Sequence, residues 1–218
     1  MSKLVLFDFD GTLADTAPDL AAAANRQRER QGLPPLPYDV LRPMASAGAR
    51  GLLKVSLDID PDHPDYESHR QQFLSDYEQH MTVLTRLFPG VPELLQSLKM
   101  QGYRWGIVTN KVEYLALPIV RHLELHTECA VTIGGDTAGH AKPHPAPLLL
   151  AAERAGFAPQ QCVYIGDDER DIVAGKAAGM PTIAAAYGYC NPAQVANWQA
   201  DAVAHQVTDL LGHINRLL

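Results

Sequence analysis

The sequence is poor in cysteine and in positive charge, and it has no long hydrophobic run. Cys129, Cys162 and Cys190 are widely spaced and odd in number, which favours reduced thiols in a cytoplasmic protein over a disulfide framework, and none has metal-site spacing. The 18 Lys and Arg residues are outnumbered by 25 Asp and Glu, so we expect no nucleic-acid partner. Apolar runs are too short to span a membrane, and the start of the chain does not resemble a signal peptide, so no membrane association is expected.

The overall composition is that of an ordinary globular protein. Hydrophobic residues make up 46% and charged residues 20% of the 218 positions, which argues against disorder. This length is enough to bury one good core with a smaller appended unit. The net charge of -7 still allows a small anionic substrate, because local cations can outweigh a diffuse, salt-screened field.

The N-terminal segment combines a buried strand with two acidic residues. Leu4 to Phe7 is a short apolar run typical of a strand buried on both faces of a parallel sheet, and Asp8 and Asp10 follow it, with Gly11 and Thr12 next. Ligands of open α/β sheets bind at the carboxyl ends of strands. Two carboxylates at such a position need a cation, a proton or strong donors, unless the strand simply leaves the sheet through a polar Asp-Gly turn.

Segments typical of strands and helices alternate from Pro89 onward. The expected strands are residues 103–109, 130–133, 162–165 and 182–186, and the expected helices are residues 92–100, 113–123, 145–155 and 170–178. Residues 14–87 instead show helical patterning and no convincing strand. We therefore predict an α/β fold, a Rossmann-like parallel sheet with helices on both faces, formed by residues 1–13 and 88–218, with an α-helical cap of residues 14–87 inserted after the first strand.

Polar residues also follow later strands of the predicted sheet. Thr109 and Asn110 follow one strand, Lys142 precedes a helix, and Gly166 leads into a cluster with three aspartates, which are Asp167, Asp168 and Asp171. Since the carboxyl ends of parallel strands share one edge, we expect these groups to converge with Asp8 and Asp10.

The residue types at this edge predict phosphoryl transfer. Crowded carboxylates repel, and Mg²⁺ is the hard cation that such oxygen ligands hold together with a substrate phosphate. A lysine and a threonine beside the ion suit a phosphoryl group. One of the two leading aspartates can attack phosphorus while its neighbour handles protons, which implies an aspartyl-phosphate intermediate.

These motifs, in this order, resemble the four motifs of the haloacid dehalogenase superfamily of phosphatases. They are Asp8-Phe9-Asp10-Gly11-Thr12, Thr109-Asn110, Lys142-Pro143 and Gly166-Asp167-Asp168 with Asp171, and the resemblance extends over the whole chain. It implies that Asp8 is the nucleophile and that Asp10 is the general acid and then the general base. Mg²⁺ would be held by Asp8, the backbone carbonyl of Asp10 and Asp167.

The resemblance assigns roles to the remaining motif residues as well. Thr109, Asn110, Lys142 and Gly11 would bind the phosphoryl group, and Thr12 would support the site. Asp171 would orient Lys142 or support the metal. Many relatives have a serine where this chain has Asp168, which leaves open whether Asp167 alone or both carboxylates reach the ion.

Several of these residues also have ordinary structural explanations. Lys142 on its own would be a surface lysine, Asp171 a first-turn helix acid, and Thr109-Asn110 a helix cap. In the cap, Arg50 follows a small, glycine-bearing segment at a helix start, where it would bind a carboxylate or sugar oxygen of the substrate or simply be exposed.

The resemblance narrows the substrate to small phosphomonoesters that carry a carboxylate. The chain is similar to phosphoglycolate phosphatases, and its segment Tyr187-Gly188-Tyr189 is similar to a branch acting on N-acetylmuramic acid 6-phosphate. The more distant alternatives are a sugar phosphomutase, a phosphonatase using Lys54, and a non-catalytic regulator that binds sugar phosphates. Dehalogenases of the superfamily lack the second aspartate, so Asp10 argues against that reaction. We expect a monomer or homodimer.

Overall fold

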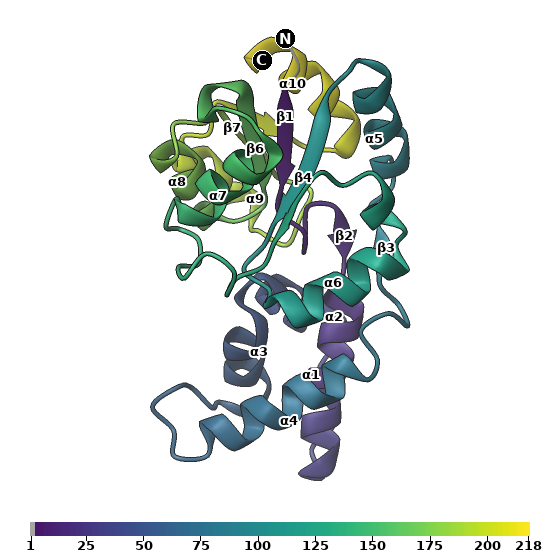
Figure 1. Cartoon of the computed structure of the whole chain (residues 1–218). Helices are drawn as coiled ribbons and strands as arrows, with labels where there is room; N and C mark the ends of the chain where they lie inside the picture. The colour runs from purple at the N-terminus through teal and green to yellow at the C-terminus, as the bar shows by residue number, and fades with distance from the viewer. Residues whose placement is uncertain (1–2) are drawn as a thin grey trace. The chain divides into compact units, whose positions relative to one another are not determined.

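A computed structural model of the protein describes residues 3–218, and Figure 1 shows its ribbon. The described chain divides into two compact units, one formed by the residues up to Ala14 together with Leu87–Leu218, the other by Asp15–Arg86. Each unit has its own secondary structure, and we describe them in turn.

The first unit is built around a parallel sheet. Among residues 3–218 this sheet has six strands, in the order β5 (Thr132–Ile133), β4 (Arg104–Val108), β1 (Leu4–Phe7), β6 (Cys162–Gly166), β7 (Thr182–Ala185) and β8 (Ala202–Ala204). All five neighbouring pairs are parallel. The predicted fold class, a parallel α/β sheet with a helical insertion, is confirmed.

Helices cover both faces of this sheet. The helices α7 (Ala146–Ala155) and α8 (Glu169–Ala177) pack on one face, where Leu4, Leu6 and Tyr164 share a buried cluster with residues of both helices. The helices α5 (Val91–Met100) and α10 (Leu210–Leu217) contact each other on the other side in Figure 1. In α5 the buried residues Val91, Leu94, Leu95 and Leu98 have helical spacing, so one face of this helix is apolar. The remaining helices are α6 (Glu113–His122) and α9 (Pro192–Val195).

The position of β1 explains why its residues are entirely apolar. It lies in the middle of the sheet, with Leu4 paired to both Arg104 of β4 and Cys162 of β6, and all four residues of β1 are buried. β6 is likewise buried at every residue, although its Tyr164 carries a hydroxyl. A strand with sheet neighbours on both sides and helices on both faces has no polar surface to contact, so its polar residues can lie just beyond its end.

The second unit is helical. It contains α1 (Ala17–Arg30), α2 (Tyr38–Leu41), α3 (Gly48–Leu57) and α4 (Tyr66–Glu78). Asp19 of α1 accepts hydrogen bonds from the backbone of Leu84 and Thr85, and Asp76 of α4 pairs with Arg30, so both ends of α1 are held within the unit.

Two short strands correct the expectation that residues 14–87 contain none. The strands β2 (Ala14–Asp15) and β3 (Arg86–Leu87) pair with each other in a two-stranded sheet of the described chain. Each has only two residues, which is too short for any alternation of polar and apolar residues to be recognised.

Candidate active site

The first acidic residue of the site directly follows the central strand. The backbone amide of Asp8 donates to Ile165 O at 2.8 Å, so the pairing of β1 with β6 continues to this residue. The Asp8 carboxylate is buried, and its Oδ1 accepts from the Phe9 amide at 2.7 Å. The strand therefore delivers a fixed carboxylate at the carboxyl end of the sheet.

The turn after Asp10 is shaped to receive a second carboxylate. Gly11 has a φ of +85°, and a Cβ at this position would lie 2.2 Å from Oδ2 of Asp167. Thr12 Oγ1 donates to Asp167 Oδ1 at 3.2 Å. The Asp-Gly-Thr sequence thus serves more than a chain reversal, because a side chain at residue 11 would displace the Asp167 carboxylate.

A second glycine lies against Asp167 from the C-terminal part of the chain. A Cβ at Gly188 would lie 2.3 Å from the Cβ of Asp167, and the next residue, Tyr189, donates its amide to Asp167 Oδ2 at 2.8 Å. The hydroxyl of Tyr187 donates to Thr12 O at 2.9 Å. The segment Tyr187-Gly188-Tyr189, identified in the sequence by resemblance alone, therefore packs directly on the acidic cluster.

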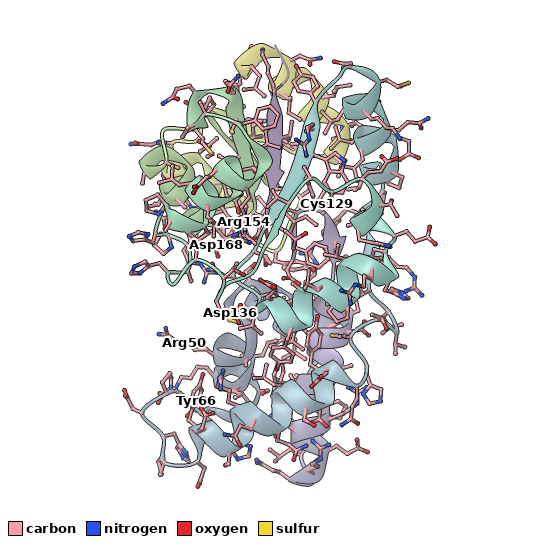
Figure 2. The ribbon with its side chains drawn as sticks, viewed as in Figure 1. Arg50, Tyr66, Cys129, Asp136, Arg154 and Asp168 are labelled. Carbon is pink, nitrogen blue, oxygen red and sulfur yellow. The ribbon has the colours of Figure 1, made fainter. Side chains whose placement is uncertain are left out.

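The structure separates the acidic residues that follow β6 into different environments. Asp8, Asp167 and Asp171 each offer an oxygen within 4.8 Å of the others. Asp168 instead caps the start of α8, where its carboxylate accepts from the Arg170 amide and from the Arg170 side chain at 2.7 and 2.9 Å. The third member of the cluster with Asp8 and Asp167 is therefore Asp171 and not Asp168. Asp168 is labelled in Figure 2.

Lys142 lies at the centre of this cluster, with only 2% of its side chain exposed. Its ammonium is 2.9 Å from Asp8 Oδ1 and 2.7 Å from Asp171 Oδ1. It also contacts Val108 O at 3.0 Å and the Tyr164 hydroxyl at 2.7 Å. Lys142 is therefore a buried cation, not a surface lysine.

The side chain of Asn110 binds both the backbone N–H and the backbone C=O of Lys142. Its Nδ2 donates to Lys142 O at 2.9 Å, and its Oδ1 accepts from Lys142 N at 2.8 Å. The side chain that the sequence assigned to phosphate binding thus fixes the loop that carries Lys142, a contact that the sequence did not predict.

Two residues of the site were missed in the sequence. Tyr164 lies inside β6, and its fully buried hydroxyl contacts Lys142, Val108 O at 2.8 Å and Asp171 Oδ1 at 3.2 Å. Lys111 directly follows Thr109-Asn110, and its ammonium lies 2.6 Å from Asp10 Oδ1. In the sequence, two features could have indicated these residues: Tyr164 carries a hydroxyl within a buried strand, and Lys111 is a cation beside a motif.

Burial and like charge shift the acidity of these groups. Burial, opposed by Lys142, raises the pKa of Asp8 to about 7. Burial and the neighbouring Asp8 and Asp171 carboxylates raise the pKa of Asp167 well above its usual range. Burial works to lower the pKa of Lys142, but the Asp171 and Asp8 carboxylates outweigh it, and the pKa is raised.

The charge of the site fits a divalent cation. Among the described site residues, five carboxylates (Asp8, Asp10, Asp167, Asp168 and Asp171) face three cations (Lys111, Lys142 and Arg170). When all are ionised, two negative charges remain, and the clustered oxygens are hard ligands. Asp8, Asp167 and Asp171 could therefore hold a divalent metal ion.

The remaining predicted residues lie in two different places. Thr109 is buried in the first unit, with its Oγ1 3.5 Å from Asp10 Oδ2. Arg50 lies in the first turns of α3 in the helical unit, where it is exposed (Figure 2). Exposure is one of the two alternatives that the sequence left open for Arg50, and its contact with substrate stays a prediction.

The sequence and the fold both match known proteins. Residues 5–185 match the family model described as haloacid dehalogenase-like hydrolase. The chain is 47% identical over 209 residues to a phosphoglycolate phosphatase of Xanthomonas campestris pv. campestris (strain 8004), covering 95% of this chain and 94% of the relative. It is 41% identical over 217 residues to an N-acetylmuramic acid 6-phosphate phosphatase of Pseudomonas aeruginosa, covering 99% of this chain and 96% of the relative.

A solved structure with a similar fold supports the same grouping. The crystal structure of a predicted phosphoglycolate phosphatase from Haemophilus somnus superimposes with a TM-score of 0.85 at 29% identity and covers 97% of both chains. Within residues 3–218, no helix is long and apolar enough to cross a membrane. The chain belongs to the haloacid dehalogenase-like hydrolase family and is an enzyme of its phosphatase group.

Proposed function

We propose that the protein is a Mg²⁺-dependent phosphomonoester hydrolase that acts through an aspartyl-phosphate. The observation that carries this proposal is the buried Lys142 ammonium, which lies between Asp8 and Asp171 with the Asp167 carboxylate in the same cluster. This arrangement combines a nucleophile, a cation for the phosphoryl oxygens and ligands for a metal within one small volume.

The contacts of Asp171 indicate which carboxylates are available to the metal. Its Oδ1 is held by Lys142 at 2.7 Å and by the Tyr164 hydroxyl, and its Oδ2 accepts from the Asp168 amide at 3.0 Å. Asp8, Asp167 and the backbone carbonyl of Asp10 would therefore hold Mg²⁺, with Asp171 orienting Lys142. When bound, Mg²⁺ neutralises charge on the phosphoryl group and orients it.

The reaction that we propose has two halves. In the first, an Asp8 carboxylate oxygen attacks phosphorus, the bond from phosphorus to the leaving-group oxygen breaks, and Asp10 gives that oxygen a proton. In the second, water attacks the phosphorus of the aspartyl-phosphate, the bond from phosphorus to the Asp8 oxygen breaks, Asp10 accepts a proton from the water, and inorganic phosphate is released with Asp8 restored as a carboxylate. Lys142, Thr109 and backbone groups beside Gly11 and Asn110 would stabilise the phosphoryl oxygens.

The substrate that we propose is a small phosphomonoester carrying a carboxylate. Phosphoglycolate is the first candidate, and N-acetylmuramic acid 6-phosphate is the second; the names of the relatives support both. In this proposal the helical unit acts as the cap, with Arg50 contacting the leaving group. From the cysteine usage we expect a cytoplasmic enzyme. We expect it to be a monomer or a homodimer.

The environment of Lys54 supports hydrolysis over phosphonatase chemistry. A phosphonatase needs a cap lysine that forms a Schiff base, and this requires a neutral amine. The Lys54 ammonium is 2.6 Å from Asp58 Oδ1 and 3.3 Å from Asp60 Oδ2, and these hydrogen bonds raise its pKa. Both partners favour the protonated form.

The test is a panel of phosphomonoesters with Mg²⁺, including phosphoglycolate and N-acetylmuramic acid 6-phosphate, followed by release of inorganic phosphate. We expect turnover of at least one carboxylate-bearing ester, and we expect Asp8→Asn to remain folded while losing at least about a thousandfold in kcat. Transfer of phosphate back to a sugar without release would indicate a mutase. Tight binding without turnover would indicate a regulator, and wild-type turnover by Asp8→Asn would refute the assigned nucleophile.

A further inference from the structure

Lys111 is a largely buried cation that contacts the second aspartate of the site. Only 8% of its side chain is exposed, and its ammonium lies 2.6 Å from Oδ1 of Asp10, whose side chain is 13% exposed. Placing an ammonium out of water is costly unless a well-placed anion compensates it. An apolar side chain would fill the same space without that cost. We therefore look for the role of Lys111 in its contact with Asp10.

The backbone of Lys111 is fixed, which sets where its side chain can reach. Lys111 O accepts from the Gly135 amide at 2.8 Å. A Cβ at Gly135 would lie 2.3 Å from Asn110 O, so the two loops approach more closely than any other residue would allow. The loop after β4 is therefore held against the loop after β5 at the residue that carries the ammonium.

Lys111 also acts on the other oxygen of Asp10, through Thr109. The Lys111 amide donates to Thr109 Oγ1 at 3.1 Å, so the hydroxyl proton of Thr109 is available to another acceptor. Asp10 Oδ2 lies 3.5 Å from this hydroxyl, a separation at the long limit for a hydrogen bond. Oδ1 is thus held firmly by the ammonium, whereas the contact of Thr109 with Oδ2 is loose.

We propose that Lys111 is a positioning residue for Asp10: it fixes the carboxyl group through Oδ1 so that Oδ2 is the oxygen that carries the proton. This inference rests on the proposed function. In the first half-reaction the proton moves from Oδ2 to the leaving-group oxygen as the bond from phosphorus to that oxygen breaks and the bond to Asp8 forms. The ammonium can stay on Oδ1 in both states of Asp10, because the oxygen of a protonated carboxyl group still accepts a hydrogen bond, and it does not occupy the oxygen that donates.

The leaving group provides a test, because a residue that acts through the general acid matters only when the leaving oxygen needs a proton. The leaving group of phosphoglycolate is an alkoxide, which needs a proton, whereas the leaving group of p-nitrophenyl phosphate is a stable phenolate. The quantity to measure is kcat/KM, which reports phosphoryl transfer to Asp8 and not the shared second half-reaction. If phosphoglycolate is not a substrate, the best alkyl ester of the panel takes its place.

For Lys111→Met we expect kcat/KM on the alkyl ester to fall by at least about tenfold more than on p-nitrophenyl phosphate. Lys111→Arg should recover part of the loss, since a guanidinium also holds Oδ1. In an Asp10→Asn background, Lys111→Met should add less than about twofold, because its effect passes through Asp10. Lys99→Met is the matched control, since Lys99 is an exposed lysine of α5 that pairs with Glu128, and both esters should react as in the wild type.

Other outcomes are equally informative. An equal loss on both esters, or an additive loss in the Asp10→Asn background, would overturn the proposal and indicate that Lys111 acts on the phosphoryl group or on the fold. Thermal melts identify a variant that does not fold, in which case Lys111→Gln takes its place. If the wild type hydrolyses neither ester, the proposed function itself fails. If the wild type hydrolyses both but Lys111→Met shows no dependence on the leaving group, only the proposal for Lys111 fails.

Discussion

Replacing Asp167 with asparagine should stabilise the protein when no divalent ion is present. Asp167 is buried with Asp8 and Asp171, and the ligand oxygens lie within 4.8 Å of one another. Two like charges 4.8 Å apart repel by about 3.5 kcal/mol at an effective dielectric constant of about 20. Asparagine has the same shape, and its Oδ can still accept from the Tyr189 amide.

The expected rise in melting temperature follows from this repulsion. Proton uptake relieves part of it, because the pKa of Asp167 is raised by burial and by its neighbours. If about half of the repulsion persists at pH 8, the substitution contributes about 1.7 kcal/mol, which raises Tm by about 3–7 °C in a protein of this size.

Mg²⁺ should reverse the order of the two proteins. A ligand at 100 times its Kd stabilises the folded state by about 2.7 kcal/mol, which raises the wild-type Tm by about 5–11 °C. Asp167→Asn removes a ligand, so we expect its Tm to respond little to Mg²⁺. Asp167→Asn would thus raise the Tm of the metal-free protein and remove the increase in Tm that Mg²⁺ gives to the wild type.

The assay is a thermal melt at pH 8 in EDTA and in excess Mg²⁺. Asp62→Asn is the control, since Asp62 is exposed in the helical unit and its loss should change neither curve. The reasoning is refuted if Mg²⁺ leaves the wild-type melt unchanged, or if Asp167→Asn lowers Tm in EDTA.

Three further predictions concern neighbouring groups. Burial raises the pKa of Asp8 to about 7, so protonated Asp8 stabilises the folded state at low pH, and this contribution is lost as the pH rises from about 4 to 7. We therefore expect Tm in EDTA to fall over this range, and Asp8→Asn to flatten the fall. Tyr164→Phe removes a hydroxyl from Lys142 and Val108 O and should cost about 1–3 kcal/mol in urea unfolding, with a lower kcat; unchanged values for both would exclude an ordering role. Gly188→Ala places a methyl group against Asp167 and should destabilise by about 1–3 kcal/mol and raise the Mg²⁺ concentration for half-maximal activity; a wild-type Mg²⁺ titration would contradict the close packing.

The fold class followed from the sequence because long helices and buried strands leave regular patterns. The alternation from Pro89 onward indicated the parallel sheet, and the structure confirms it. The strands β2, β3 and β8 were missed because strands of two or three residues, such as Ala202–Ala204, are too short to show a period. The helix α10 was not predicted either.

Asp8 and Asp167 were predictable from their places at strand ends, whereas Tyr164, whose side chain reaches Lys142 from inside a strand, was missed. Asp8 and Asp167 follow adjacent strands, so topology alone brings them together. Tyr164 contacts Lys142 from within β6, and Asn110 binds the Lys142 backbone from another loop. Such contacts depend on the length and direction of side chains in three dimensions, and these cannot be read from patterns along the sequence.

The central place of β1 has a consequence for how the enzyme is made. The strand that leads to Asp8 leaves the ribosome well before both of its sheet neighbours, β4 and β6, which lie far along the chain. Pairings this distant in sequence form slowly. A nascent chain that stops before Asp167 carries Asp8 without Asp167 and Asp171, so the acidic cluster can form only when translation has passed β6.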